Sequence, residues 1–156
     1  MPLEIERKFL VDANQITQLS LPSGKVICQG YIATQDKTAV RIRIQGPQAF
    51  LTLKGANTGA TRVEFEYPIP VADAKSMLDQ LCSGPIIEKT RYCIPFAQHT
   101  WELDIFHGDN QGLIVAEVEL TDENESITLP PWVIEEVTGD PKYYNVNLLA
   151  APYCSW

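Results

Sequence analysis

Hydrophobic and polar residues alternate at every second position over most of the chain, which is the pattern of β-strands with one buried face. These segments are rich in Val, Ile, Thr, Phe and Tyr, and turns with Gly, Pro or Asn separate them. The predicted strands lie near residues 3–11, 25–35, 38–46, 49–55, 61–69, 86–95, 99–107 and 113–121. Most connections are short, so we expect antiparallel pairing, and closure into a barrel would remove the unpaired edges.

Three segments break the alternation and are predicted to be helical. Between Val71 and Cys82, apolar residues recur at helical spacing and a Ser-Gly-Pro stop follows. Short helices are expected at 13–20 and 143–150. The predicted fold class is therefore α+β dominated by β, a closed eight-stranded antiparallel β-barrel with a few covering helices. We expect a single domain over residues 1–156.

The composition agrees with a folded, soluble domain. The 156 residues are 45% hydrophobic, which is enough for a core and excludes a disordered chain. No apolar run approaches the roughly 20 residues of a membrane span, and the N-terminus does not resemble a signal peptide. We therefore expect a cytoplasmic protein. None of the four cysteines has disulfide-framework or zinc-ligand spacing, so free thiols are expected.

The formal net charge of −8 narrows the range of partners. A nucleic acid or an acidic membrane would require a basic surface, so neither partner is expected. A small polyanion held in a local basic pocket is still compatible with this charge.

Charged residues recur at every second position within nearly every predicted strand, and most strands carry one sign. Because side chains alternate between the faces of a strand, each set shares one face. The acidic set comprises Glu4, Glu6, Glu64, Glu66, Glu102, Asp104, Glu117 and Glu119, and the basic set comprises Lys8, Arg41, Arg43, Lys54, Lys89 and Arg91.

These charged faces allow two interpretations. Ordinary half-buried strands would turn them to water. However, the residues between the charges are large and apolar, and a solvated surface has no reason to sort its charges by strand. If the charges point inward, the barrel encloses six basic and eight acidic residues with a formal charge of −2. Such an interior must be wet and bind ions, with carboxylates suited to Mg²⁺ or Mn²⁺ and cations suited to phosphoryl oxygens.

The sequence from Glu4 to Lys8, E-I-E-R-K, resembles the E-x-E-x-K signature of the triphosphate tunnel metalloenzymes, or CYTH family. This family groups class IV adenylate cyclases with thiamine triphosphatases. The resemblance continues in order along nearly the whole chain, through Gln29-Gly30-Tyr31, Arg41 and Arg43, Leu51 to Lys54, Glu64 to Glu66, Lys89 to Arg91, Trp101 to Asp104, and Glu117 to Glu119.

The resemblance implies an inward-facing charged tunnel and a role for each charged residue. The residues expected to bind the divalent metal are Glu4, Glu6, Glu117 and Glu119, with Asp104, Glu64 and Glu66 as further acids. The residues expected to bind the triphosphate are Lys8, Arg41, Arg43, Lys54, Lys89 and Arg91. Lys8, Glu4 and Glu6 are the expected catalytic residues.

Some nearby residues are given structural roles instead. Arg7 and Arg62 are expected at the surface, outside the charged register. Glu102 either faces the interior or points outward, and Tyr31 is expected to pack within the barrel. The outer apolar strand faces leave room for a homodimer or for covering helices.

The predicted activity is hydrolysis of inorganic tripolyphosphate with Mg²⁺ or Mn²⁺, in which water attacks a terminal phosphoryl group. The short chain resembles the short bacterial inorganic tripolyphosphatases. Alternatives within the fold are a class IV adenylate cyclase, which makes cyclic AMP and pyrophosphate from ATP, and a thiamine or nucleoside triphosphatase. Outside the enzymes, a polyphosphate-binding module is the alternative, although plain anion binding does not need so many carboxylates.

Overall fold

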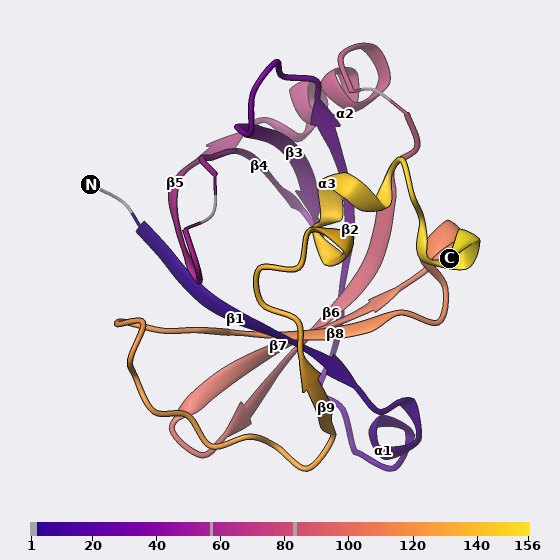
Figure 1. Ribbon diagram of the computed structural model, residues 1–156. Helices are drawn as coiled ribbons and strands as arrows, with labels where there is room; N and C mark the ends of the chain where they lie inside the picture. The colour runs from indigo at the N-terminus through magenta and orange to yellow at the C-terminus, as the bar shows by residue number, and fades with distance from the viewer. Residues whose placement is uncertain (1–2, 57, 83) are drawn as a thin grey trace.

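The computed structural model describes residues 3–56, 58–82 and 84–156, and over these residues it has nine strands and three α-helices (Figure 1). The strands are β1 (Leu3–Val11), β2 (Lys25–Ile32), β3 (Ala39–Gln45), β4 (Gln48–Lys54), β5 (Thr61–Ile69), β6 (Ile87–Phe96), β7 (His99–Phe106), β8 (Ile114–Glu119) and β9 (Val133–Glu136). The helices are α1 (Ala13–Thr17), α2 (Val71–Gln80) and α3 (Asn145–Leu148). None of them is long and apolar enough to span a membrane.

Eight of the strands form the predicted closed antiparallel barrel. Their order is β5-β4-β3-β2-β6-β7-β8-β1, and pairing of β1 with β5 closes the ring. The start of β1, at Leu3–Ile5, pairs with β5 on one edge, while Glu6–Leu10 pair with β8 on the other. The eight predicted strands match the eight barrel strands to within a few residues at each end.

The ninth strand, β9, was not predicted from the sequence. It has four residues, with Val133 half-buried and the other three exposed, so it lacks a clear alternating pattern. β9 pairs with the end of β1, at Phe9–Val11, beyond the point where β5 leaves that edge. Its partner, β1, is distant in sequence. The edge of β1 at Phe9–Val11 is free for β9 because, in the closed barrel, β5 pairs only with Leu3–Ile5.

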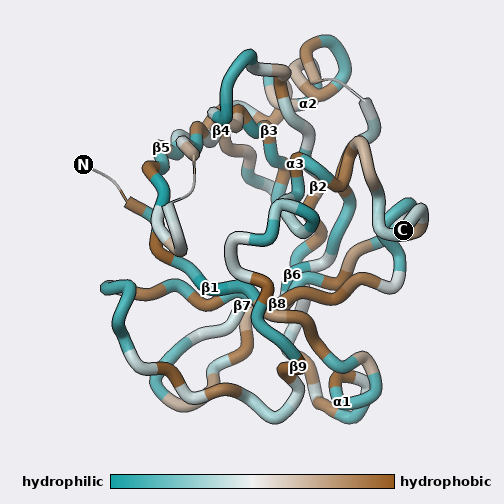
Figure 2. Tube along the Cα trace, viewed as in Figure 1, coloured by the Kyte–Doolittle hydropathy of each residue, from teal (hydrophilic) through white to brown (hydrophobic). Residues whose placement is uncertain are grey.

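The hydrophobic core lies outside the barrel, between the strands and the segments that cover them. Along β5, hydrophilic and hydrophobic residues alternate (Figure 2). Helix α2 packs on β2, β3 and β4, where Ala74 and Ile42 are fully buried. A second cluster, below the barrel in Figure 1, joins α1 and the segment before β9 to the outer faces of β1, β7 and β8. In this cluster Trp101 contacts the rings of Phe9 and Trp132, at 5.4 Å and 5.8 Å between centroids.

The outer face of β5 carries exposed aromatic residues. Phe65 is 37% exposed and Tyr67 is 52% exposed.

The predicted homodimer stays a prediction, since the structure contains one chain.

Candidate active site

A cavity of about 990 Å³ occupies the interior of the barrel, and side chains from all eight barrel strands line it. The segment that carries α3 also reaches the cavity, through residues such as Tyr144 and Asn145. All the sequence-predicted site residues except Asp104 line this cavity, namely Glu4, Glu6, Lys8, Arg41, Arg43, Lys54, Glu64, Glu66, Lys89, Arg91, Glu117 and Glu119. The charged faces of the strands therefore point inward.

Five carboxylates gather on one side of the cavity, and we call them the acidic wall: Glu4, Glu6, Glu64, Glu117 and Glu119. They come from β5, β1 and β8, which are neighbours in the barrel. Residues on one face of adjacent strands lie within contact distance, so acids on three adjacent strands are brought together. The register places Glu6 opposite Glu119.

Carboxyl groups of the acidic wall lie close enough to shift one another's pKa values. Glu6 interacts in this way with Glu4 and Glu117, and Glu64 interacts with Glu4. Burial, followed by the charges of Glu117 and Glu4, raises the pKa of Glu6 well above its ordinary value. Burial and the hydrogen bond to Glu4 raise the pKa of Glu64 to about 7. The raised pKa values of Glu6 and Glu64 thus contrast with the lowered pKa values of Glu4 and Glu117 in the same cluster.

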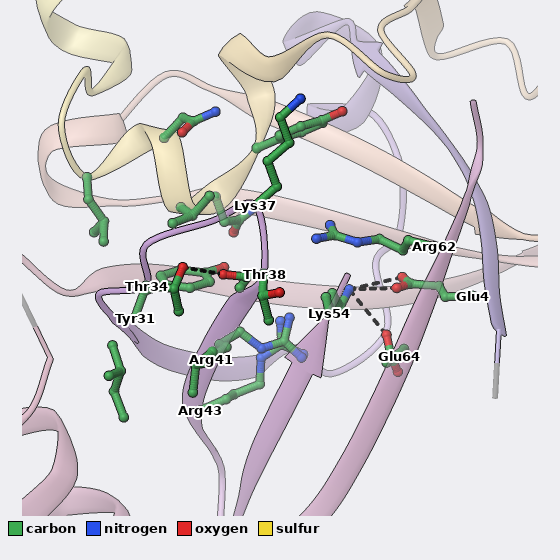
Figure 3. A pocket seen from close by; sticks show the side chains of 18 of the residues that line it. Glu4, Tyr31, Thr34, Lys37, Thr38, Arg41, Arg43, Lys54, Arg62 and Glu64 are labelled. Carbon is green, nitrogen blue, oxygen red and sulfur yellow. Dashed lines mark hydrogen bonds and ion pairs between the residues drawn. The ribbon is translucent and has the colours of Figure 1, made fainter. Parts of the chain in front are cut away.

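Two lysines supply part of the countercharge. The ammonium nitrogen of Lys54 lies 2.8 Å from Glu4 Oε2 and 3.3 Å from Glu64 Oε2 (Figure 3). Lys8 Nζ lies 3.6 Å from Glu117 Oε1. Burial opposes the charge of Lys54, but Glu4 and Glu6 outweigh it and raise the pKa of this lysine.

The chemistry of the acidic wall fits a hard divalent cation. Among the described residues, no three His, Cys, Asp or Glu side chains form a ready-made metal cluster. The raised pKa values of Glu6 and Glu64 nevertheless show an excess of negative charge that a cation would relieve, and oxygen-only ligands suit Mg²⁺ or Mn²⁺.

Four cations form what we call the basic wall: Arg41 and Arg43 from β3, and Lys89 and Arg91 from β6. Arg41 and Arg43 lie side by side in Figure 3. Burial, with the charges of Arg41 and Arg91, lowers the pKa of Arg43 to about 9. Among the described residues Arg43 has no carboxylate partner, and the buried Nε of Arg41 has no hydrogen-bond acceptor. An anion in the cavity would supply both.

Asp104 is the one predicted site residue that does not line the cavity. The sequence pattern groups it with the metal-binding acids, but its carboxylate is 2% exposed and is engaged by the basic wall. Its oxygens accept bonds of 2.7 Å and 2.8 Å from the Arg91 guanidinium, and Lys89 Nζ lies 2.7 Å away. Although burial opposes ionisation, Arg91 and Lys89 lower the pKa of Asp104 to about 2. This arrangement favours a role in holding two cations over a role in binding metal.

Arg62 lines the cavity, and its assignment to the surface was wrong. Its Nε donates to the carbonyl oxygen of Gly55 at 3.0 Å, and its side chain is directed into the cavity near Lys54 (Figure 3). Positions 62, 64 and 66 share one face of β5, so the alternation of the strand could have placed Arg62 with the two glutamates. Arg7 does lie outside, where it pairs with Glu136 at 2.6 Å.

The structure also settles the direction of Glu102 and Tyr31. Both line the cavity. Glu102 Oε2 lies 3.1 Å from Arg91 Nη1, on the same face of β7 as Asp104. The buried hydroxyl of Tyr31 accepts a hydrogen bond from Gln29 at 3.3 Å.

Residues 2–149 match the family model of the CYTH domain. The chain belongs to the CYTH domain family. It is 46% identical to an inorganic triphosphatase of Acetivibrio thermocellus, over 98% of this chain and 97% of that protein. It is 39% identical to an inorganic triphosphatase of Nitrosomonas europaea, over 93% and 95% respectively.

The fold of this CYTH domain is also that of a solved structure. The crystal structure of the inorganic triphosphatase NE1496 superposes with a TM-score of 0.64 at 34% identity, and the match covers 94% of this chain and 97% of that one. The similarity therefore extends over the whole barrel and both walls.

Proposed function

We propose that this CYTH domain hydrolyses inorganic tripolyphosphate with the help of a divalent cation, Mg²⁺ or Mn²⁺. The observation that carries the proposal is the separation of charge inside one cavity, where carboxylates gather on β5, β1 and β8 and cations on β3 and β6. A metal-bound triphosphate has the complementary charges. Two relatives named inorganic triphosphatase, similar over nearly their full length, support the same activity.

The acidic wall would hold the cation, with Glu4 and Glu6 of β1 at its centre and Glu64, Glu117 and Glu119 beside them. When bound, the cation supplies Lewis-acid polarisation of the phosphoryl oxygens. Glu66 is turned toward Arg41 and Thr52, so we place it at the border between the two walls.

The cations would bind the phosphoryl oxygens and stabilise the negative charge that spreads over them during the reaction. The proposed contacts are made by Lys8, Arg41, Arg43, Lys54, Lys89 and Arg91, with Arg62 added by the structure. We further propose that Asp104 positions Lys89 and Arg91 for this task, since its two oxygens engage both side chains.

The reaction needs no covalent nucleophile from the protein. The oxygen of a water molecule bonds to the terminal phosphorus, the bridging P–O bond breaks, and orthophosphate and pyrophosphate leave. Lys8 lies on β1 within the acidic wall, 3.6 Å from Glu117, where it would neutralise charge on the departing pyrophosphate. Catalysis would then consist of positioning and electrostatic stabilisation.

The test is a phosphate-release assay with tripolyphosphate, ATP, GTP and thiamine triphosphate, each with Mg²⁺, Mn²⁺ or EDTA. The expected result is metal-dependent release from tripolyphosphate with little release from the organic triphosphates. Formation of cyclic AMP and pyrophosphate from ATP would show a cyclase instead. Tripolyphosphate binding without any turnover would show a binding module and would overturn the proposal.

A further inference from the structure

Asn145, the first residue of α3, links the C-terminal segment to the basic wall. Its side-chain oxygen Oδ1 accepts a hydrogen bond from Gln29 Nε2 at 2.9 Å and another from Lys89 Nζ at 3.0 Å. Gln29 Oε1 in turn accepts the Nε–H of Arg43 at 2.8 Å. One amide from outside the barrel thus connects two cations of the basic wall, directly and through one intermediate.

Arg43 and Lys89 need a bridging side chain to order them together, because the strands that carry them are not adjacent. β2 lies between β3, which carries Arg43, and β6, which carries Lys89. Gln29 is the residue of β2 that fills this gap, and it is fully buried. Repulsion between neighbouring cations would otherwise push their side chains apart, and a neutral amide is the partner that orders them without cancelling their charge.

We propose that Asn145 is a positioning residue for triphosphate binding, holding Lys89 directly and Arg43 through Gln29. This proposal rests on the proposed function and identifies the C-terminal segment as part of the substrate site. Without Asn145, Lys89 keeps its ion pair with Asp104, which does not line the cavity, and its contact with the ring of Phe106. The Gln29 amide then loses an acceptor and can turn away from Arg43.

The C-terminal segment is anchored well enough to hold Asn145 in place. Leu148 of α3 is 1% exposed and packs in a cluster with Phe106, Leu113 and Val115. The main-chain oxygen of Tyr143 accepts a hydrogen bond from Lys8 Nζ at 3.3 Å. The position of Asn145 is therefore set by burial and by a bond to a second cavity residue.

The experiment compares Asn145→Ala with Asn147→Ala, a matched change two residues along the same helix. Asn147 is exposed and also borders the cavity, but its Nδ2 donates to the main chain of Pro141 at 2.8 Å instead of contacting the basic wall, so it controls for position without the link to the cations. Ala is a good helix former and position 145 is half-buried, so both variants should fold. We expect Asn145→Ala to raise the KM for tripolyphosphate about tenfold, as for a lost hydrogen bond to a charged group, with kcat changed much less.

Binding of tripolyphosphate in EDTA, measured by calorimetry, should weaken by a similar factor for Asn145→Ala and stay unchanged for Asn147→Ala. The pair Gln29→Ala and Gln29→Ala/Asn145→Ala tests the connection, because residues acting in one network have effects that do not add. The double variant should bind tripolyphosphate with about the same affinity as whichever single variant binds it less tightly.

Unchanged KM and binding in Asn145→Ala would overturn the positioning role, as would equal losses in Asn145→Ala and Asn147→Ala or fully additive effects with Gln29→Ala. These outcomes are read against the wild type. If the wild type itself fails to hydrolyse tripolyphosphate but binds it, the proposed function fails and the positioning role is still tested by the binding measurement.

Discussion

The acidic wall and the basic wall of the cavity carry surplus charge of opposite sign and accommodate it differently. On the acidic wall, the pKa values of Glu6 and Glu64 are raised, and Lys54 adds countercharge. On the basic wall, one buried carboxylate, Asp104, serves two cations, and Arg43 has only the neutral amide of Gln29.

The difference shows how each wall can adjust. Carboxyl groups with raised pKa values can release protons when a cation arrives, so the acidic wall can change its charge near neutral pH. On the basic wall, burial lowers the pKa of Lys89 to about 7, but a guanidinium keeps its proton at that pH. The charge of Arg43, which has no carboxylate partner among the described residues, is therefore left for an anion to balance. The two walls are therefore complementary halves of a site for a metal-bound polyanion.

The largest expected effect comes from removing charge at the centre of the acidic wall. Glu4→Gln combined with Glu6→Gln should lower kcat by about 100-fold or more, because loss of the metal removes several kcal/mol of transition-state stabilisation. Tripolyphosphate binding in EDTA should be equal or tighter, because two acids near the anion are gone. Turnover and metal titration measure the first effect, and calorimetry measures the second.

Glu88→Gln is the matched control, since Glu88 is an exposed residue of β6 and does not line the cavity. Its turnover should equal that of the wild type. If the double variant kept its metal-dependent turnover, the acidic wall would not be the metal site and the comparison between the walls would lose its basis.

A smaller effect is expected on the basic wall. Arg43→Ala should raise the KM for tripolyphosphate by roughly 10- to 100-fold, the range for a lost hydrogen bond between charged groups, and leave metal affinity unchanged. Arg43→Lys should recover only part of the loss, since an ammonium cannot reproduce a bidentate contact. A change in metal affinity as large as the change in KM would show that the walls do not act separately.

The smallest expected effect is a pH dependence of stability in the metal-free protein. The pKa of Glu64 is raised to about 7, so the folded state binds more protons than the unfolded chain between the ordinary carboxyl pKa and pH 7. Its contribution is therefore complete below the ordinary pKa and is lost as pH rises through about 7. Thermal unfolding in EDTA from pH 5 to 6.5 should show Tm falling, whereas closer to pH 7 the lowered pKa of Lys89, about 7, acts in the opposite direction.

Glu64→Gln should flatten this fall, because glutamine does not titrate. Mg²⁺ should stabilise the wild type more at pH 7.5 than at pH 5.5, since protons and the cation compete for the same oxygens. A Tm that rises over this range in EDTA would contradict the raised pKa of Glu64. A Mg²⁺ effect that is independent of pH would show that protons and the cation do not compete on the acidic wall.

Much of the site could be predicted because strand periodicity reports on side-chain direction. Arg41 and Arg43 share one face of their strand, and large apolar residues occupy the other face. Because the apolar face must be covered by the rest of the chain, the charged face is left to point into the barrel. The same rule, applied fully to β5, would have included Arg62. By contrast, the ion pairs of Asp104 depend on the register of β6 against β7, which places Arg91 opposite Asp104 and which no local pattern specifies.

Asn145 shows the limit of such reasoning most clearly. It is 116 residues from Gln29 and 56 from Lys89 along the chain, and a polar residue in a short helix gives no signal of a role in the barrel. Likewise, β9 has too few residues to show a period, and its pairing exists only where β5 leaves the edge of β1 free.

The sequence by itself indicated a barrel with charge inside, because alternation is a local property and most strands carry one sign on one face. Only the tertiary structure decided which charges meet. Closure by β1 and β5 brings the acids of three neighbouring strands together, while β2 lies between the two basic strands and carries the amide that orders them. Pair distances, burial and pKa shifts depend on neighbours across strands, and those neighbours are chosen by the packing of the whole chain.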